Sequence, residues 1–401
     1  MNIGNIMDIR KQKGMQIAKT CQIEKKGSAW VVPSQSGSGS YNVEQKSGVF
    51  ACTCKDYELR GDPNHPCKHV YAVLTVVLKW MDEKTGRIVE VKRVYTQNWS
   101  VYNKSQIEEK ERFMALLKGL IENVPETQRV GRGRPNMPMR DQLFASALKV
   151  YSQFSLRRFM TDLNSAKNSG YVDNAPCYSL VGKFMERKDI TPILYDLVEK
   201  SALPLKGIES KFAIDSSGFR TTQFNDYCRE KHNTGREHQW LKAHICTGVF
   251  TNIVTSVKIT DENGSDCLEF IPLSKTTYQN GFKIDEMSAD KAYSSRDNLE
   301  CINELNGTAL IPFKSNATGK AKGSAQWKKM YHYFMYNKDE FLQRYHLRSN
   351  VETTFFMIKA KFNDMLKSKS RVAQINELLL KILCHNLVVV NSAINEFGVT
   401  V

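Results

Sequence analysis

The hydrophobic pattern divides the chain into three regions with different periodicity. In roughly the first hundred residues, short alternating or mixed apolar runs at 15–21, 29–33 and 41–45 are broken by Gly and Ser clusters. Such a pattern is typical of a small antiparallel sheet. A more continuous apolar run after Cys67 predicts a helix through Leu78. The first region is therefore expected to be a small β-β-α module.

The second region, residues 101–205, has a helical pattern. Residues 105–108 read Ser-Gln-Ile-Glu, the form of a capping box, and apolar positions follow at broadly helical spacing. Residues 125–138 then interrupt the pattern with prolines and a basic linker. Three or four further helices are predicted at about 140–153, 155–168, 178–188 and 191–202.

In the third region, strand-like and helical runs follow one another. Strands are predicted at 211–215, 241–249, 253–260, 282–290 and 308–312, with a helix at 296–305 between the last two. A long helix is expected over 345–359. The strongly apolar stretch 376–387 predicts a helix that closes the core, with His385 either in the core or supporting the site. This order of elements indicates an α/β domain.

The net charge of the chain limits the kinds of molecule that it is expected to bind. The 401 residues include 57 Lys and Arg against 42 Asp and Glu, a formal net charge of +15. A chain this basic most often binds nucleic acid and less often an anionic membrane. No apolar run was read as long enough to cross a membrane, and the N-terminus has no signal-peptide pattern. We therefore expect a cytoplasmic protein, associated with the nucleoid when bound to DNA, with no membrane partner.

Three of the ten cysteines lie close together in sequence and form pairs with metal-ligand spacing. Cys52 and Cys54 follow a predicted strand, and Cys67 and His69 begin the predicted helix. Three thiolates and one imidazole make a closed tetrahedral zinc set, which would stabilise a module with little core of its own. His65 is a weaker candidate for the fourth ligand, and three unrelated buried cysteines are the structural alternative. The other seven cysteines are expected to be buried small apolar residues.

The Cys-x-Cys and Cys-x-His order of these residues resembles the SWIM zinc finger. The resemblance implies a Zn²⁺-binding module that contacts nucleic acid or protein.

Two further features of the helical region suggest contact with DNA. Gly131-Arg132-Gly133-Arg134-Pro135 resembles an AT-hook core, in which Arg132 and Arg134 would lie in a narrow A·T minor groove. A plain basic linker is the alternative. A helix that begins at Ser155 with paired arginines has the look of a DNA-binding helix-turn-helix, and equally of a helical bundle with a charged outer face.

The candidate chemistry lies in three carboxylates. Asp215 and Asp290 each stand at the end of a predicted strand, and Glu352 lies on the long helix. Each alone would be an ordinary turn former or surface residue. Placed together, they can hold two hard cations and support phosphoryl transfer. On a single helix, the steps of three, four and seven residues would put Tyr345, Arg348, Glu352 and Lys359 on one face.

Residues 345–359 match the Tyr-x2-Arg-x3-Glu-x6-Lys signature of the DDE insertion-sequence transposases, and Asp215 and Asp290 match the first two acids. The resemblance implies an RNase H-like mixed five-stranded sheet with flanking helices. It implies Mg²⁺, with Mn²⁺ as the alternative, at the three acids, and cleavage and strand transfer of element ends. Arg348 and Lys359 would contact terminal DNA phosphates, and Tyr345 would help to position that strand. The implied partners are the terminal inverted repeats, target DNA and further copies of the chain.

Between Asp290 and Glu352, residues 314–338 interleave basic and aromatic side chains. One hypothesis is that Trp327 or a neighbour stabilises a flipped or frayed base near the cut. An aromatic core patch is the alternative.

We expect a zinc module over 1–100, a helical and DNA-binding segment over 101–205, a catalytic domain over 206–375 and a C-terminal helix over 376–401. The function favoured is a DNA transposase. The alternatives are a non-catalytic DNA-binding protein derived from a transposase, and a metal-dependent nuclease without strand transfer.

Overall fold

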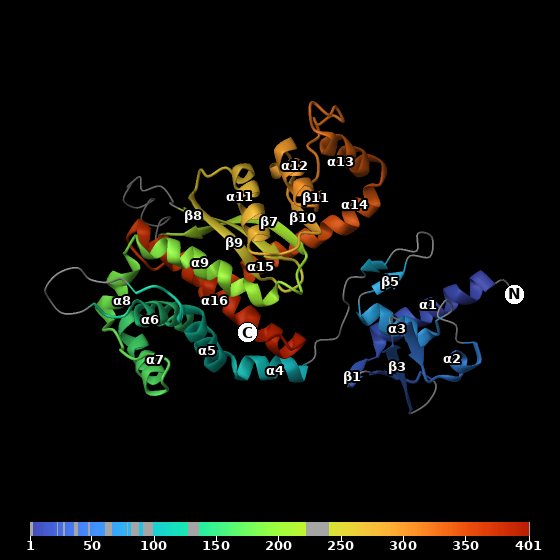
Figure 1. The fold of residues 1–401 in the computed structure, drawn as a ribbon, viewed down its shortest axis with the longest axis horizontal. Coiled ribbons are helices and arrows are strands. Elements are labelled where there is room, and N and C mark those ends of the chain that lie inside the picture. Colours follow the sequence, from blue (N-terminus) through green and yellow to red (C-terminus); the bar gives the residue numbers. More distant parts are fainter. Residues whose placement is uncertain are drawn as a thin grey trace, which may run out of the picture. The chain divides into compact units, whose positions relative to one another are not determined.

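The chain forms two compact units, Met1–Trp99 and Ser100–Val401 (Figure 1). The computed structural model describes residues 3–21, 23–26, 29–35, 39–46, 49–60, 66–77, 79–81, 88–90, 99–126, 136–221 and 240–400. Each unit is described by itself below.

The first unit is a four-stranded antiparallel sheet packed against helices. Its strands lie in chain order: β1 (Glu24–Lys26), β2 (Ala29–Pro33), β3 (Ser40–Lys46) and β4 (Val49–Cys52). The helices are α1 (Ile3–Thr20), α2 (Lys55–Arg60) and α3 (Lys68–Val77), and β5 (Lys79–Met81) pairs with β6 (Ile88–Glu90). Its described core holds Ile17, Val32, Val43, Val70 and Val73 together with the three clustered cysteines. The small antiparallel sheet and the helix after Cys67 are confirmed.

The strand prediction at residues 15–21 is wrong, because residues 15–20 belong to α1. Gly14, Ile17 and Cys21 recur at steps of three and four residues, and this spacing places them on one side of a helix. Ile17 is fully buried. A Cβ atom at Gly14 would lie 2.5 Å from Tyr71 Cβ, so glycine allows α1 to pack closely on α3. Packing of α1 against α3 therefore favours a helix here, although the short apolar run by itself predicts a strand.

The second unit begins with a helical layer. Its helices are α4 (Trp99–Ile107), α5 (Glu109–Ile121), α6 (Met139–Ser152), α7 (Leu156–Asn168), α8 (Tyr178–Met185) and α9 (Ile190–Ala202), followed by the 3₁₀ turn η1 (Leu203–Leu205). The four helices expected after the linker are all present. The capping box at 105–108 is wrong: Ser105 lies inside α4, and its carbonyl and hydroxyl oxygens both accept from Asn391 Nδ2, at 3.0 and 3.1 Å.

The sheet of the second unit has five strands in the order β11-β10-β7-β8-β9. These are β7 (Lys211–Arg220), β8 (Trp240–Gly248), β9 (Val254–Asp261), β10 (Glu286–Ala289) and β11 (Thr308–Leu310). The first three pair antiparallel, while β10 is parallel to both β7 and β11. This mixed order is the RNase H-like arrangement expected.

Helices cover both faces of this sheet (Figure 1). Helix α9 packs on β9, and the described helices after β9 are α11 (Asp266–Gln279), α12 (Arg296–Glu304), α13 (Ala325–Tyr336), α14 (Lys338–Tyr345), α15 (Ser349–Phe362) and α16 (Arg371–Phe397), with 3₁₀ turns η2 (Lys291–Tyr293) and η3 (His346–Arg348). Along β7, Ala213 and Phe219 join the core that contains α15 and the helical layer. Phe212 and Ile214 join the core that contains α11 and η2. Odd-numbered residues of β7 therefore face α15, and even-numbered residues face α11.

Two sequence expectations about helices are corrected. The run 345–359 is not one helix, because η3 separates Tyr345 at the end of α14 from Ser349 at the start of α15. Among the described residues, α16 is long and apolar enough to cross a membrane by length and composition, contrary to the sequence reading. Within its most apolar window 89% is buried inside the protein, so α16 serves here as a core helix.

Candidate active site and zinc site

The first site is the cluster of Cys52, Cys54, Cys67 and His69. The ends of β4 and α3 bring one ligand atom from each residue within 4.8 Å of the others, and all four side chains are buried. Cys52 Sγ lies 3.8 Å from His69 Nδ1, and His69 Nε2 has no hydrogen-bond partner in the structure. The ring of His69 stacks on Tyr41 with centroids 4.4 Å apart. His65 lies outside the described residues.

Hydrogen bonds and burial shift the pKa values of the three clustered cysteines. Hydrogen bonding to Cys52 lowers the pKa of Cys67 to about 4, against the opposing effect of burial. The same hydrogen bond raises the pKa of Cys52, and burial raises that of Cys54. A thiolate buried among these side chains is costly without a cation. Three sulfurs and one ring nitrogen at this separation fit Zn²⁺.

The second site lies where the middle of β7 and the end of β10 meet α15; β7 continues to Arg220, so the prediction that Asp215 ends its strand is wrong. Asp215 is on β7, and Asp290 directly follows β10. Because β10 and β7 are parallel with Ala289 opposite Ile214, the two acids occupy the next adjacent positions. Neighbouring strands are about 4.8 Å apart. Glu352 lies in the first turn of α15, which packs along β7.

Arg348 joins two of the three acids. Its Nη1 donates to Asp215 Oδ2 at 2.9 Å, and its Nη2 donates to Glu352 Oε1 at 2.5 Å. Burial raises the pKa of Asp215, and the charges of Asp290 and Glu352 raise it further, while Arg348 opposes them. The structure therefore brings together the three acids that the sequence singled out, and Arg348 binds two of them.

The acids are spaced more widely than the zinc ligands. In the described part of the chain, only the cysteine cluster brings three such ligand atoms within 4.8 Å of one another. The guanidinium of Arg348 instead occupies the space between Asp215 and Glu352. The carboxylate oxygens that now bind the Arg348 guanidinium are hard oxygen ligands, the type that Mg²⁺ and Mn²⁺ prefer.

The other residues of the signature lie beside the acids. Lys359 Nζ donates to Ser217 Oγ at 2.7 Å and lies 5.1 Å from the centroid of Phe219, so it is held along β7. Burial lowers the pKa of Lys359. Tyr345 is half-buried at the end of α14, and burial raises its pKa.

Trp327 is a core residue of α13. Its side chain is only 6% exposed, and its Nε1 donates to the Thr318 carbonyl at 2.8 Å. Phe313 meets the ring edge-on at 4.8 Å, and Arg296 lies 4.4 Å from its centroid. This geometry fits the alternative of an aromatic core patch, and we assign Trp327 no part in base stacking. Arg132 and Arg134 lie outside the described residues.

Sequence reasoning missed a polar group behind Asp215. Asp266 is the first residue of α11, a helix that was not predicted because Pro272 within it argues against helix. Its carboxylate contacts Ser216, Lys242 and His244. Ser265-Asp266 before an apolar run was the available signal of a helix start.

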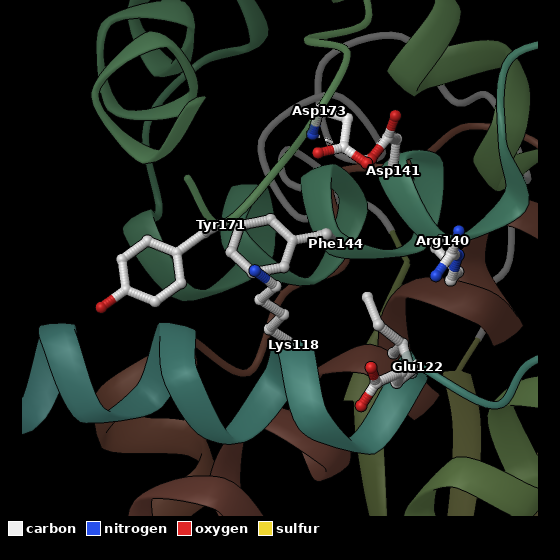
Figure 2. Close-up of a pocket in the computed structure, with 8 residues that line it drawn as sticks. Lys118, Glu122, Arg140, Asp141, Phe144, Tyr171 and Asp173 are labelled. Carbon is white, nitrogen blue, oxygen red and sulfur yellow. Dashed lines mark hydrogen bonds between the residues drawn. The ribbon is translucent and has the colours of Figure 1, made fainter. Parts of the chain in front are cut away.

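A small pocket of about 70 Å³ lies in the helical layer (Figure 2). Residues of α5, α6 and the loop after α7 line it, and none comes from β7, β10 or α15. Asp141 in its wall accepts from the backbone N–H groups of Asp173 and Asn174. The carboxylate is therefore used to hold that loop.

A mixed sheet of this order, with one acid within β7, one directly after the adjacent β10 and one on the covering helix, defines an RNase H-like domain. The family model described as "Transposase DDE domain" matches residues 206–387, and the "SWIM zinc finger" model matches residues 51–78. The chain thus carries a transposase DDE domain and an N-terminal SWIM zinc finger.

Among solved structures, the cryo-EM structure of a piggyBac transposase synaptic complex with hairpin DNA is similar. The identity is 11% and the TM-score 0.36, over 73% of this chain and 74% of that chain. No curated protein matches.

Proposed function

We propose that this protein is a DNA transposase that binds the ends of an insertion element and catalyses metal-dependent DNA cleavage and strand transfer. The observation that carries the proposal is the proximity of Asp215, Asp290 and Glu352, with Arg348 bound to Asp215 and Glu352. The match of residues 206–387 to the transposase DDE domain supports it.

Within this proposal the three acids hold divalent cations, Mg²⁺ or Mn²⁺. Such ions, when bound, activate an attacking hydroxyl and screen charge on the departing oxygen. The remaining work falls to the chain: Arg348 and Lys359 bind phosphates of the terminal strand, and Tyr345 positions it. Arg348 can do so because a phosphate offers the same paired oxygens as the carboxylates it now binds.

The other regions supply binding. We propose that residues 1–100 form a zinc module that grips DNA or protein. Residues 101–205 with the basic linker 125–138 contact DNA, residues 206–375 carry the chemistry, and residues 376–401 complete the core. Two element ends must be brought together, so we propose that copies of the chain assemble on DNA, in the cytoplasm at the nucleoid.

A strand-transfer assay tests the function. The full chain is incubated with Mg²⁺, a supercoiled plasmid and a labelled fragment containing an inverted repeat that flanks the coding sequence. Joined product is expected. Cut fragment without joining would indicate a nuclease, and a shifted band without cutting would indicate a DNA-binding protein; either result contradicts the proposal.

The acid assignment has its own test. Asp290→Asn keeps the shape of the side chain but removes a charged metal ligand. Cleavage is expected to fall below detection while the DNA band shift is retained. A variant that still joined ends would show that Asp290 is not part of the metal site.

A further inference from the structure

A second polar cluster lies on the face of the sheet opposite Asp215. Its members come from two strands, one helix and one 3₁₀ turn: Ser216 on β7, Lys242 and His244 on β8, Asp266 on α11 and Tyr293 in η2. Ser216 pairs with His244 in the strand register. Asp215 faces α15, so the next residue, Ser216, faces α11.

Ser216 connects this cluster to the acidic site. Its backbone N–H donates to Asp215 Oδ1 at 2.8 Å, and its hydroxyl donates to Asp266 Oδ1 at 2.8 Å. Asp215 uses its other oxygen for Arg348. Ser216 therefore links the two carboxylates: its backbone N–H binds one oxygen of Asp215, and its hydroxyl on the opposite face binds Asp266.

The Asp266 carboxylate is held in place by its neighbours. Lys242 Nζ lies 2.6 Å from its Oδ1, and Asp266 stands in the first turn of α11, where the helix dipole favours a negative charge. Partial burial would raise its pKa, but Lys242 and Ser216 hold the pKa of Asp266 below its usual range. The carboxylate is thus ionised and accepts hydrogen bonds at neutral pH.

Two buried polar atoms around Asp266 have no hydrogen bond in the described structure. His244 Nδ1 lies 3.3 Å from Asp266 Oδ1 but is not aligned for one, while Nε2 lies 2.8 Å from Thr260 Oγ1. The hydroxyl of Tyr293 is also without a partner, in a side chain that is 1% exposed. Tyr293 lies close enough to Asp215 and Asp266 for both charges to raise its pKa, although burial is the larger cause.

We propose that Asp266 is a positioning residue which, through Ser216, sets the Asp215 carboxylate for divalent-cation binding. The inference rests on the proposed metal site at Asp215, Asp290 and Glu352. It adds to that site a residue, Asp266, that acts on Asp215 through its hydrogen bond with Ser216. Groups that orient metal ligands commonly change metal affinity by about 10–100-fold when they are removed.

The test measures Mn²⁺ binding to the zinc-loaded full chain without DNA, by the electron paramagnetic resonance signal of free Mn²⁺. Asp266→Ala and Ser216→Ala are each expected to weaken binding by about tenfold or more. Both substitutions remove the hydrogen bond between the Ser216 hydroxyl and Asp266. The double variant should therefore bind Mn²⁺ no more weakly than whichever single variant has the lower affinity. Ser216→Thr keeps the hydroxyl and should restore affinity.

Asp196→Ala is the matched control. Asp196 forms an ion pair with Lys200 at 2.8 Å on α9 and has no recorded link to β7. It should leave Mn²⁺ affinity unchanged. A purely structural role for Asp266 would lower the melting temperature of Asp266→Ala while its Mn²⁺ affinity stayed that of the unmodified chain, and this result would overturn the inference, as would multiplicative losses in the double variant.

The proposed function fails in a different way. If the unmodified chain does not bind Mn²⁺, or if Asp215→Asn binds it equally well, then the acidic site itself is misassigned and the inference falls with it. Normal Mn²⁺ binding that depends on Asp215 but not on Asp266 overturns the positioning role alone.

Discussion

Arg348 is the residue that lets two of the three acids lie close together without a metal ion. Its two hydrogen bonds offset the cost of burying Asp215, whose side chain is 23% exposed, while Glu352 is 60% exposed and partly screened by solvent. A divalent cation at the acids would compete with this guanidinium for the same oxygens. Binding of a DNA phosphate by Arg348 would remove the competitor, so DNA binding and metal binding should favour each other.

Arg348→Gln should therefore change the response to metal. Without divalent cations the variant should be less stable by about 1–2 kcal/mol, because the carboxylates repel without compensation. Mg²⁺ should then raise its melting temperature more than that of the unmodified chain. Calorimetry with and without Mg²⁺ checks this. Arg187→Gln, which removes the pair with Asp189 on the surface, is the control. Equal Mg²⁺ responses in all three proteins would count against competition at the acids.

At the scale of elements, the contact of α1 with α3 depends on one glycine. A Cβ atom at Gly14 would lie 2.5 Å from Tyr71 Cβ and 2.7 Å from the Lys68 carbonyl, on the helix that carries His69. Gly14→Ala gains up to about 1 kcal/mol in helix propensity. Overpacking against α3 costs about 1–3 kcal/mol of folding stability. This cost should exceed the gain in helix propensity, so Gly14→Ala should destabilise the first unit.

The first unit of Gly14→Ala should accordingly melt earlier and bind Zn²⁺ more weakly, as measured by circular dichroism and a zinc indicator. Gly119→Ala in α5 is the matched substitution, because nothing lies within 4 Å of its added Cβ. It should stabilise the second unit by about 0.5–1 kcal/mol. If both substitutions stabilise, the close approach at Gly14 is not limiting.

The elements also show what the sequence can and cannot reveal. Asp290 follows the end of β10 as the sequence predicts, whereas Asp215 lies in the middle of β7, which continues five residues beyond the predicted end; parallel pairing places the two acids side by side. Helix α11 was missed because Pro272 hides it, and Asp266 was missed with it. The role of Trp327 depends on Phe313 and Thr318, whose approach is a property of the tertiary fold and leaves no periodicity in the sequence.

At the scale of the whole molecule, the two units differ in what stabilises them. The described core of the first unit is small and includes the cysteines themselves, whereas the second has extensive cores on both faces of its sheet. Removal of Zn²⁺ by a chelator should unfold the first unit and leave the melting transition of residues 100–401 in place. Tryptic cleavage confined to residues 1–99 after chelation would agree with this. Loss of both transitions together would contradict it.

Acid should destabilise the second unit through buried histidine. His385 on α16 is 3% exposed, its Nε2 lies 2.8 Å from the Asn252 carbonyl, and burial lowers its pKa from 6.5 to about 4. The folded state therefore keeps His385 neutral where the unfolded chain already binds a proton. Its contribution to stability is complete above pH 6.5 and is lost as the pH falls to 4, by about 3 kcal/mol at most.

His385→Gln removes this titration while keeping a side chain that can donate to the Asn252 carbonyl. The variant should be less stable than the unmodified chain at pH 7, because the replacement packs less well in a filled core. Its free energy of unfolding should nevertheless decline less steeply between pH 6.5 and 4, since one proton-binding difference between the two states is gone. Urea unfolding across that range measures the slope, and parallel curves for the two proteins would show that His385 does not carry the acid sensitivity.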